Sequence, residues 1–598
     1  MKFKASSSLT ACVLIGSCGK KKVQPESGNS NKESFMRIRV DVDLEKGSIA
    51  RTDLPTTAQW FGGRALADSI LLHEVPPACH PLGAGNLLVF APGLFAGTPM
   101  PTASRMSVAG KSPLTRGIKE SNVGGVAGMT LAQLGIGGVV IRGISSGGHP
   151  QLLLLGKRSA EFRDVPELHG LGNYQTVEIL KKRFGNEVVI LSIGPCGEMK
   201  MSAATIAVTD NNGRPCRHAG RGGLGGVMGA KGLKAIVIDP EGSQLRKGSD
   251  PEAFSEAIKE YTRILQSSKK TAFWRENGTA GLVDVSHARG SLPTRNFTAG
   301  AYDKKDGVNA ERIKALVSQR KGSMGHACMK GCLVRCSNIF NDPQGRYLTS
   351  GLEYETIAMM GPNLDIDDVD TIAQIDFRCD DYGIDTIETG ATLGILSETD
   401  LFRFGDRERA IQLVDEIGKG TLLGRVLGQG VTTTGRVFGI SRIPAVKGQA
   451  FPAHEARSLK GLGVTYATSP QGADHTAGFV AEEPFSIEGH TERSRNAQIN
   501  VAIADSLGLC QFTGLRDDYD LFARLIGALT GKIPSAEEVR RIGREALWKE
   551  RTFNEAAGIG PGQDRLPEFL RSEALPPNHN AFDVGDEDLD RVFGDYPE

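Results

Sequence analysis

Three cysteines, Cys328, Cys332 and Cys336, stand at four-residue intervals in the segment "HACMKGCLVRC". On a straight helix they would spread along roughly 12 Å of axis, so a ligand shared by all three needs a bent backbone, which Gly331 allows. Three interpretations stay open: inert buried thiols, a zinc site or an iron–sulfur cluster held by four cysteines. Structural zinc more often uses paired knuckles than one dense triplet. We therefore favour the cluster, which requires a distant fourth ligand.

A short sequence pattern that occurs twice, which we call the echo, contains a candidate for that fourth ligand. Residues 380–385 read "DDYGID" and residues 505–510 read "DSLGLC", and both fit the pattern D-x-x-G-[LI]-[DC]. Two similar loops that each grip a copy of one ligand would show such an echo, whereas each match alone also fits a helix end followed by glycine. Cys510 ends the second loop. We find no other convincing repeat in the sequence.

A glycine-rich stretch, "AGRGGLGGVMGAK", combines bare backbone N–H groups with Arg221 and Lys231. Such a loop suits phosphate, because the N–H groups can cradle the oxygens and the cations balance their charge. No G-K-[ST] closes the stretch and it lacks the spacing of a dinucleotide-binding fingerprint. A purely structural glycine-rich hairpin is the alternative interpretation.

The composition predicts a large globular protein that must contain more than one core. A chain of 598 residues exceeds the size of one hydrophobic core. Lysine plus arginine and aspartate plus glutamate each total 70, which argues against a dedicated nucleic-acid binder. Ten cysteines are too few for a disulfide scaffold in a chain of this length. No apolar run approaches the roughly 20 residues that span a bilayer.

The residue patterns divide the sequence into a strand-rich and a helix-rich region. Short apolar runs with turn signals between them predict strands up to about residue 240, for example "NLLVFAPG", "IGGVVIRG", "EVVILSIG" and "LKAIVID". Asp250 as an N-cap and Pro251 at the first helical position then open a run of amphipathic helices. We expect an α+β protein with a leader or disordered extension at 1–35, a β-rich domain at 36–247 and mainly helical domains at 248–450 and 451–598. Residues 1–18 resemble a weak lipoprotein-like leader, although we favour a working protein that begins at Met36.

Several of these stretches, together with others, form one set of sequence motifs. They are "SRMSVAGKSPLTRGIKESNVGG", the glycine-rich stretch, the cysteine triplet, "GLEYETIAMMGPN", the two D-x-x-G loops and "YATSPQGADHTAG". As a set they resemble the aldehyde:ferredoxin oxidoreductase family from about residue 36 to near the C-terminus. The resemblance implies a β-rich pterin-binding domain followed by two mainly helical domains.

The resemblance also implies cofactors and the residues that hold them. The expected groups are a tungsten (or molybdenum) bis-pterin, a Mg²⁺ ion that bridges the pterin phosphates, and a [4Fe–4S] cluster. Cys328, Cys332, Cys336 and Cys510 would hold the cluster. The expected cofactor-binding residues are Arg105, Asn122, Arg217, Ala219, Gly220, Arg221, Gly222, Lys231, Asp380, Asp385, Asp505 and Leu509.

The resemblance assigns catalysis to a glutamate, Glu353 or Glu355, and to His475. A buried carboxylate can take a proton from water, and a histidine can exchange one near neutral pH. The implied reaction oxidises a small aldehyde to a carboxylic acid and passes electrons to ferredoxin or a similar carrier. The implied enzyme is cytoplasmic, with a homodimer as a possible assembly.

Two features depart from the family pattern: the first gap of the triplet is x3 rather than x2, and Gln471 stands where relatives often carry arginine.

Two rival functions are distinguishable by experiment. A tungsten subunit of a larger reductase would act on a non-aldehyde substrate and copurify with other subunits. A non-catalytic iron–sulfur protein that lost the pterin would contain iron without tungsten.

Overall fold

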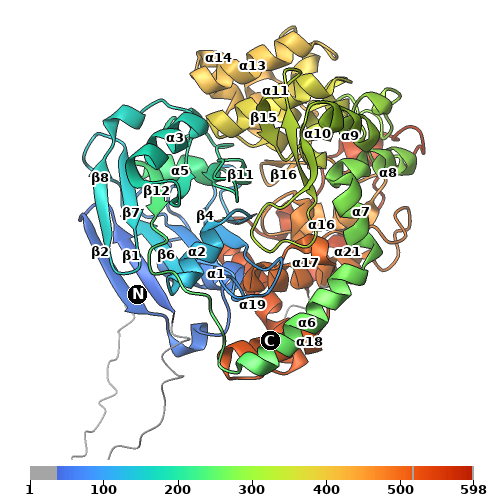
Figure 1. Cartoon of the computed structure of the whole chain (residues 1–598). Coiled ribbons are helices and arrows are strands. Elements are labelled where there is room, and N and C mark those ends of the chain that lie inside the picture. The colour runs from blue at the N-terminus through green and yellow to red at the C-terminus, as the bar shows by residue number, and fades with distance from the viewer. Residues whose placement is uncertain (1–36, 515–516, 595–598) are drawn as a thin grey trace, which may run out of the picture.

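The computed structural model describes residues 37–514 and 517–594, so the leader predicted at 1–35 lies outside the described residues. Two β-sheets form one side of the molecule and helices form the other (Figure 1). This arrangement confirms the α+β class, with β-rich structure first and mainly helical structure after it. No helix in the described part of the chain is long and apolar enough to cross a membrane.

The β-rich region contains two six-stranded sheets. The first has the order β2-β1-β6-β3-β4-β5 and the second β11-β10-β9-β12-β7-β8. Their bounds are β1 (Ile38–Asp43), β2 (Ser48–Asp53), β3 (Leu88–Pro92), β4 (Met106–Lys111), β5 (Ile118–Val123), β6 (Ile136–Arg142), β7 (Gln151–Leu155), β8 (Ala160–Asp164), β9 (Val189–Ser192), β10 (Ile206–Val208), β11 (Arg217–Ala219) and β12 (Leu233–Ile238). Apolar residues from both sheets share one core.

The two sheets have the same connectivity, a repeat that the sequence analysis missed. In each, the first strand pairs with the second antiparallel and with the last in parallel, and the third pairs antiparallel with the last and the fourth. Each unit inserts one helix before its third strand and another before its last. These helices are α1 (Gly63–Glu74) and α2 (Ala127–Gln133) in the first unit, and α3 (Asn173–Phe184) and α5 (Leu224–Ala230) in the second. A short helix, α4 (Pro195–Glu198), follows β9.

Only the start of the glycine-rich stretch is a loop, because residues 224–230 form the buried helix α5. Glycine normally weakens a helix, but here it permits close backbone packing. A Cβ atom at Gly225 would clash with the carbonyl of Thr205, and one at Gly229 with the carbonyl of Gly197. The interpretation of the whole stretch as one phosphate-cradling loop was therefore too broad.

The remaining chain is mainly helical. Its helices are α6 (Pro251–Ser267), α7 (Lys269–Asn277), α8 (Leu282–Arg289), α9 (Ala310–Gln319), α10 (Tyr354–Met360), α11 (Val369–Tyr382), α12 (Thr386–Ile395), α13 (Arg407–Lys419), α14 (Leu422–Leu427), α15 (Val431–Phe438), α16 (Lys460–Thr468), α17 (His490–Leu507), α18 (Tyr519–Thr530), α19 (Ala536–Ala556), α20 (Phe569–Ser572) and α21 (Asp586–Gly594). Short strands are β13 (Ser323–His326), β14 (Ser337–Asn341), β15 (Tyr347–Ser350), β16 (Ala445–Val446) and β17 (Gln449–Ala450). The predicted cap is confirmed, since the Asp250 side chain accepts a hydrogen bond from the Ala253 N–H.

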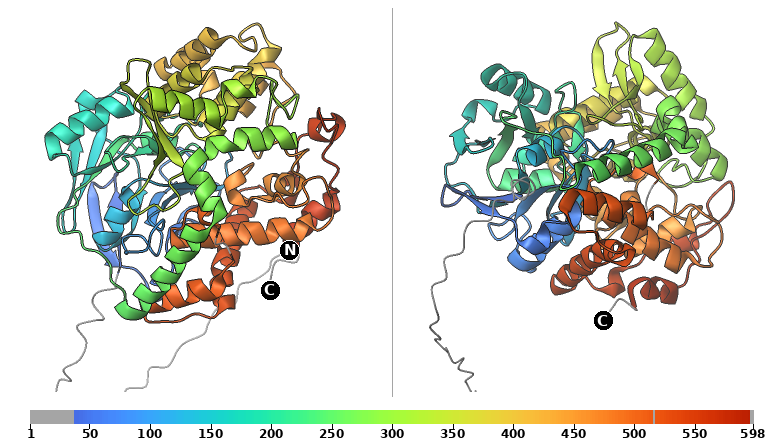
Figure 2. Two further views of the ribbon diagram at one scale, coloured as in Figure 1. Left: turned by 45° about the vertical axis from the view of Figure 1, so that its right-hand side comes forward. Right: turned by 60° about the horizontal axis from the view of Figure 1, so that its bottom comes forward.

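Helix α1 of the first unit packs against α17 and α19, which come from the C-terminal part of the chain. Figure 2 shows this blue helix beside orange and red ones. Arg64 of α1 donates two hydrogen bonds of 2.8 Å to the carboxylate of Glu550 in α19, and both side chains are buried. A bidentate pair of this kind fixes orientation as well as distance. The C-terminal helices are thereby locked onto the sheet that carries part of the candidate site.

Candidate functional site

The four predicted cluster cysteines lie together in one packed group. Cys328, Cys332 and Cys336 belong to a loop rather than a helix, and Gly331 has a φ of +73°, as the bent backbone required. The Cys510 N–H donates to the carbonyl of Thr102 at 3.2 Å. The structure thus brings the triplet and the second D-x-x-G loop to the same place. The role of these thiols as ligands stays a prediction.

Thr102 joins the two cysteine-bearing segments and was missed by the sequence analysis. Its N–H donates to the carbonyl of Gly331 at 3.2 Å, and its hydroxyl accepts from the Leu333 N–H at 2.9 Å. The Cys510 N–H donates to the carbonyl of Thr102, so Thr102 is hydrogen-bonded to both cysteine-bearing segments. These contacts run mostly through backbone atoms, so no residue type in the sequence marks them.

The charges around Cys328 favour its thiolate form. A hydrogen bond from the Cys332 thiol, aided by the guanidinium groups of Arg217 and Arg105, lowers the pKa of Cys328 to about 6, although burial opposes the shift. The same hydrogen bond and burial raise the pKa of Cys332, so the pair favours one thiolate, at Cys328. Thiolate is the form that binds metal. In residues 37–514 and 517–594, no three His, Cys, Asp or Glu side chains converge on a position for a single metal ion. Four thiols packed in one group, three of them buried and Cys328 half-buried, suit a cluster held by four cysteines.

The two D-x-x-G loops are helix ends, α11 and α17, with Gly383 and Gly508 in the left-handed conformation that ends helices. They dock at equivalent places in the two units. The Gly508 carbonyl accepts from the Arg105 N–H at 3.1 Å just before β4, and the Gly383 carbonyl accepts from the Thr205 N–H at 2.9 Å just before β10. The echo in the sequence therefore reflects two equivalent contacts with a duplicated base.

Each docked loop contains a buried carboxylate oxygen that no group in the described part of the chain satisfies. Oδ2 of Asp380 and Oδ1 of Asp505 have no hydrogen-bond partner among the described residues. Buried polar atoms are normally hydrogen-bonded, so these oxygens fit N–H donors of a ligand. Asp385 is different, because its oxygens accept from the Ile387 N–H at 2.9 Å and from Arg221 at 3.3 Å. Asp385 caps helix α12.

The structure gathers most of the other predicted cofactor residues at the ends of β4, β5 and β11. Arg105 donates to the side chain of Asn122 and, at 2.9 Å, to its carbonyl. Arg217 donates to the Ser337 hydroxyl at 2.9 Å. Buried Leu509 follows the second docked glycine. Strand β11 lies against β5, and in the loop after β11 the Arg221 N–H donates to the Ser121 hydroxyl at 3.4 Å. That loop begins after Ala219 and includes Gly220, Arg221 and Gly222.

Lys231 lies apart from this group. It follows α5, and its ammonium donates to the carbonyls of Asn86 at 2.6 Å and Gly143 at 3.2 Å. Burial lowers the pKa of Lys231 to about 8. Its bonds hold the first unit to the second.

The structure distinguishes between the two candidate glutamates. Oε1 of Glu355 lies 3.4 Å from Nε2 of His475 and 3.4 Å from Nε2 of His454. Oε2 of Glu355 accepts from the Ala453 N–H at 2.7 Å, while Oε1 has no hydrogen-bond partner among the described residues. Burial raises the pKa of Glu355, and His475 opposes part of the shift. Glu353 instead accepts from the Thr279 hydroxyl at 2.6 Å and lies 3.6 Å from Arg217.

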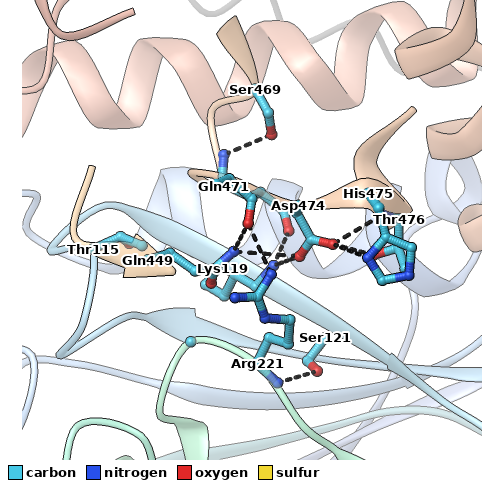
Figure 3. A network of polar contacts seen from close by, with 12 residues as sticks. Thr115, Lys119, Ser121, Arg221, Gln449, Ser469, Gln471, Asp474, His475 and Thr476 are labelled. Atoms are coloured by element: carbon cyan, nitrogen blue, oxygen red, sulfur yellow. Dashed lines mark hydrogen bonds and ion pairs between the residues drawn. The ribbon is translucent and has the colours of Figure 1, made fainter. Parts of the chain in front are cut away.

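The loop that carries His475 is held by cations from both units of the base (Figure 3). Lys119 of β5 donates to Asp474 at 2.7 Å and to Gln471 at 2.9 Å. Arg221 donates to the Ala473 carbonyl at 2.8 Å. Asp474 in turn accepts from the backbone of Thr476 at 2.9 Å, which fixes the turn around the histidine. No local pattern in the sequence marks Lys119 or Asp474, because only the fold brings them together.

Comparisons with known proteins agree with this architecture. The family model for the N-terminal domain of aldehyde ferredoxin oxidoreductase matches residues 39–240, and the model for domains 2 and 3 matches residues 256–596. The chain belongs to the aldehyde ferredoxin oxidoreductase family and is an oxidoreductase of that type.

Related proteins differ in what their names say they act on. The tungsten-containing aldehyde ferredoxin oxidoreductase of Thermococcus kodakarensis is 31% identical over 573 residues, which cover 91% of this chain and 92% of the relative. That of Pyrococcus abyssi is 32% identical over 87% and 89%. The WOR-like subunit of an aliphatic sulfonate oxidoreductase from Pyrococcus furiosus is 28% identical over 86% and 85%. The active-site complex BamBC of benzoyl coenzyme A reductase, with 1,5-dienoyl-CoA, shares the fold at a TM-score of 0.77 and 20% identity over 93% of each chain.

Proposed function

We propose that this protein oxidises a small aldehyde to its carboxylic acid at a tungsten bis-pterin. Aldehyde and water would yield the acid, two protons and two electrons. Cys328, Cys332, Cys336 and Cys510 would hold a [4Fe–4S] cluster, which would supply electron transfer to ferredoxin or a similar carrier. The observation that carries the proposal is the partly buried Glu355–His475 pair in a site that also contains two equivalent loops, each with a carboxylate oxygen that has no hydrogen-bond partner among the described residues.

In this proposal some residues bind the cofactor and others transfer protons. When bound, the pterin-held metal supplies two-electron redox chemistry, which side chains alone cannot provide. Asp380 and Asp505 would each accept N–H donors of one pterin. The amide oxygen of Asn122, which accepts a hydrogen bond from Arg105 in this structure, would be a ligand for Mg²⁺. Molybdenum in place of tungsten would need the same protein groups.

Glu355 and His475 transfer protons in this proposal. Because burial raises the pKa of Glu355, its carboxylate is a stronger base than an exposed one and can take a proton at Oε1 from water. His475 lies 3.4 Å from the same oxygen and can receive that proton. Lys119 and Arg221 keep the histidine loop in place while the proton moves.

Metal and pterin content tests this proposal directly. The protein is purified without oxygen from cells supplied with tungstate and molybdate, and its tungsten, molybdenum, iron and pterin are measured. About one tungsten, two pterins and four irons per chain, followed by aldehyde-dependent reduction of a dye, would support it. Iron with neither heavy metal nor pterin, in a host that makes the cofactor, would leave a non-catalytic iron–sulfur protein.

A second candidate function is a tungsten subunit of a larger oxidoreductase. The names of two similar proteins favour it, since one is a subunit of a sulfonate oxidoreductase and the other belongs to a benzoyl coenzyme A reductase complex. Copurifying subunits, and full cofactor loading without turnover of simple aldehydes, would decide for this alternative.

A further inference from the structure

The surface above the cysteine group is built from three short segments: helix α7, residues 327–335 and residues 511–514. The rings of Trp274 and Phe512 lie 4.9 Å apart, and both pack against the cysteines. Cys328 is half-buried while the other three cysteines are buried. Lys330 is exposed although it lies between Cys328 and Cys332. Only a thin layer of protein therefore separates the group from solvent on this side.

Five exposed cations stand on these segments: Lys269, Lys270, Arg275, Lys330 and Arg335. We call Arg275, Lys330 and Arg335 the basic rim, because they lie on the cysteine loop or in contact with it. None of the three forms an ion pair with a carboxylate in the described part of the chain. Nη2 of Arg275 donates to the carbonyl of Leu333 at 2.7 Å, which ties α7 to the cysteine loop.

The rim is a local excess of positive charge. The three segments contain one acidic residue, Glu276, and its carboxylate lies 3.9 Å from Lys314. The chain as a whole has 70 basic and 70 acidic residues and no formal net charge. A cluster of unpaired cations beside the cysteines is therefore not a consequence of a basic protein. Such a patch attracts an anionic partner and speeds its encounter.

We infer that the basic rim is the docking surface for a small acidic electron-carrier protein, an inference that rests on the proposed function. Electrons released at the buried site must leave through the cluster, and this thin layer is where a second redox centre can approach it. Electron-transfer encounters are weak and use small interfaces, so complementary charge rather than buried apolar area determines orientation and association rate.

The test compares two charge-reversal variants of the holoenzyme. The rim variant carries Arg275→Glu, Lys330→Glu and Arg335→Glu. The control carries Arg403→Glu, Lys419→Glu and Arg436→Glu, three cations that are also exposed and without an ion-pair partner in the described residues, on the helical region around α13 and α15. Binding of a purified acidic ferredoxin is measured at several salt concentrations, together with aldehyde oxidation coupled to that ferredoxin or to a small dye.

We expect the rim variant to bind ferredoxin roughly tenfold or more weakly at low salt and to lose most of the salt dependence. The control should bind as the unmodified enzyme does. Equal binding by the rim variant and the unmodified enzyme would overturn the inference. If the rim variant does not load iron, the neutral pair Lys330→Gln and Arg335→Gln is measured in its place. Dye-coupled oxidation reports on the proposed function separately, because its absence in the unmodified enzyme leaves the binding comparison intact.

Discussion

The ion pair between Lys119 and Asp474 gives the most direct test of how the histidine loop is held. Both side chains are only 2% exposed, and Nζ lies 2.7 Å from Oδ2. Lys119→Met keeps the length of the side chain and removes its charge. Burial alone would raise the pKa of Asp474, but Lys119 and Arg221 hold that pKa well below its ordinary range. The variant would leave a buried carboxylate without its nearest cation.

Removing one partner of a buried pair costs about 3–5 kcal/mol. We expect the free energy of unfolding of Lys119→Met, measured in urea, to fall by that amount. In Lys119→Met/Asp474→Asn the carboxylate is also gone, so part of the loss should be recovered. A loss below about 1 kcal/mol in the single variant, or a double variant less stable than either single one, would contradict the geometry.

The pH dependence of this pair has a definite sign. The pKa of Asp474 is lower in the folded protein than in the unfolded chain, where it is about 3.9. Its contribution to stability is therefore complete above that value and is lost as the pH falls toward the folded pKa. The stability difference between the unmodified protein and Lys119→Met should shrink on acidification below about pH 4.

Three further predictions concern the site. Glu355→Gln should retain tungsten and iron and lower kcat by roughly 10²–10⁴-fold, and the unmodified rate should fall as acid protonates Glu355, whose pKa is raised; an unchanged rate would exclude it as the base. Cys510→Ser should lower the iron content, while Cys379→Ser, another buried thiol, should not; iron equal to the unmodified protein would remove Cys510 from the ligand set. Gly93→Ala should destabilise the protein by about 1–3 kcal/mol, because a Cβ there clashes with Gly508, whereas Gly138→Ala has room; equal stability of the two variants would contradict the close contact.

Local patterns predicted most elements because their causes are local. Alternating and apolar runs predicted strands such as β3 and β12, and the cap at Asp250 predicted the start of α6. The glycine-rich stretch was misjudged beyond Gly223, since helix α5 depends on what its glycines pack against. The duplication of the sheets also escaped notice, because it lies in strand pairing and not in shared residues.

The candidate site was predictable where residue type signals chemistry. Cysteines, a glutamate and a histidine could be named before the structure, and the fold places Glu355 beside His475. Their supports could not be named. Lys119 and Asp474 are distant in sequence, and Thr102 acts mainly through its backbone. Lys231 has the right charge for phosphate but binds two carbonyls elsewhere.

The last residue of each D-x-x-G loop is where the two halves of the site diverge. Gly383 and Gly508 dock in the same way onto equivalent strands, and each loop has one aspartate oxygen without a hydrogen-bond partner in residues 37–514 and 517–594. At the final position Asp385 caps a helix, whereas Cys510 joins the cysteine group. Two equivalent docked loops suit a ligand present in two copies, and under the proposed function Cys510 would connect one of these loops to the cluster. The two units of the base therefore differ at the last residue of the docked loop, and the basic rim lies on the side of the unit whose loop ends in Cys510.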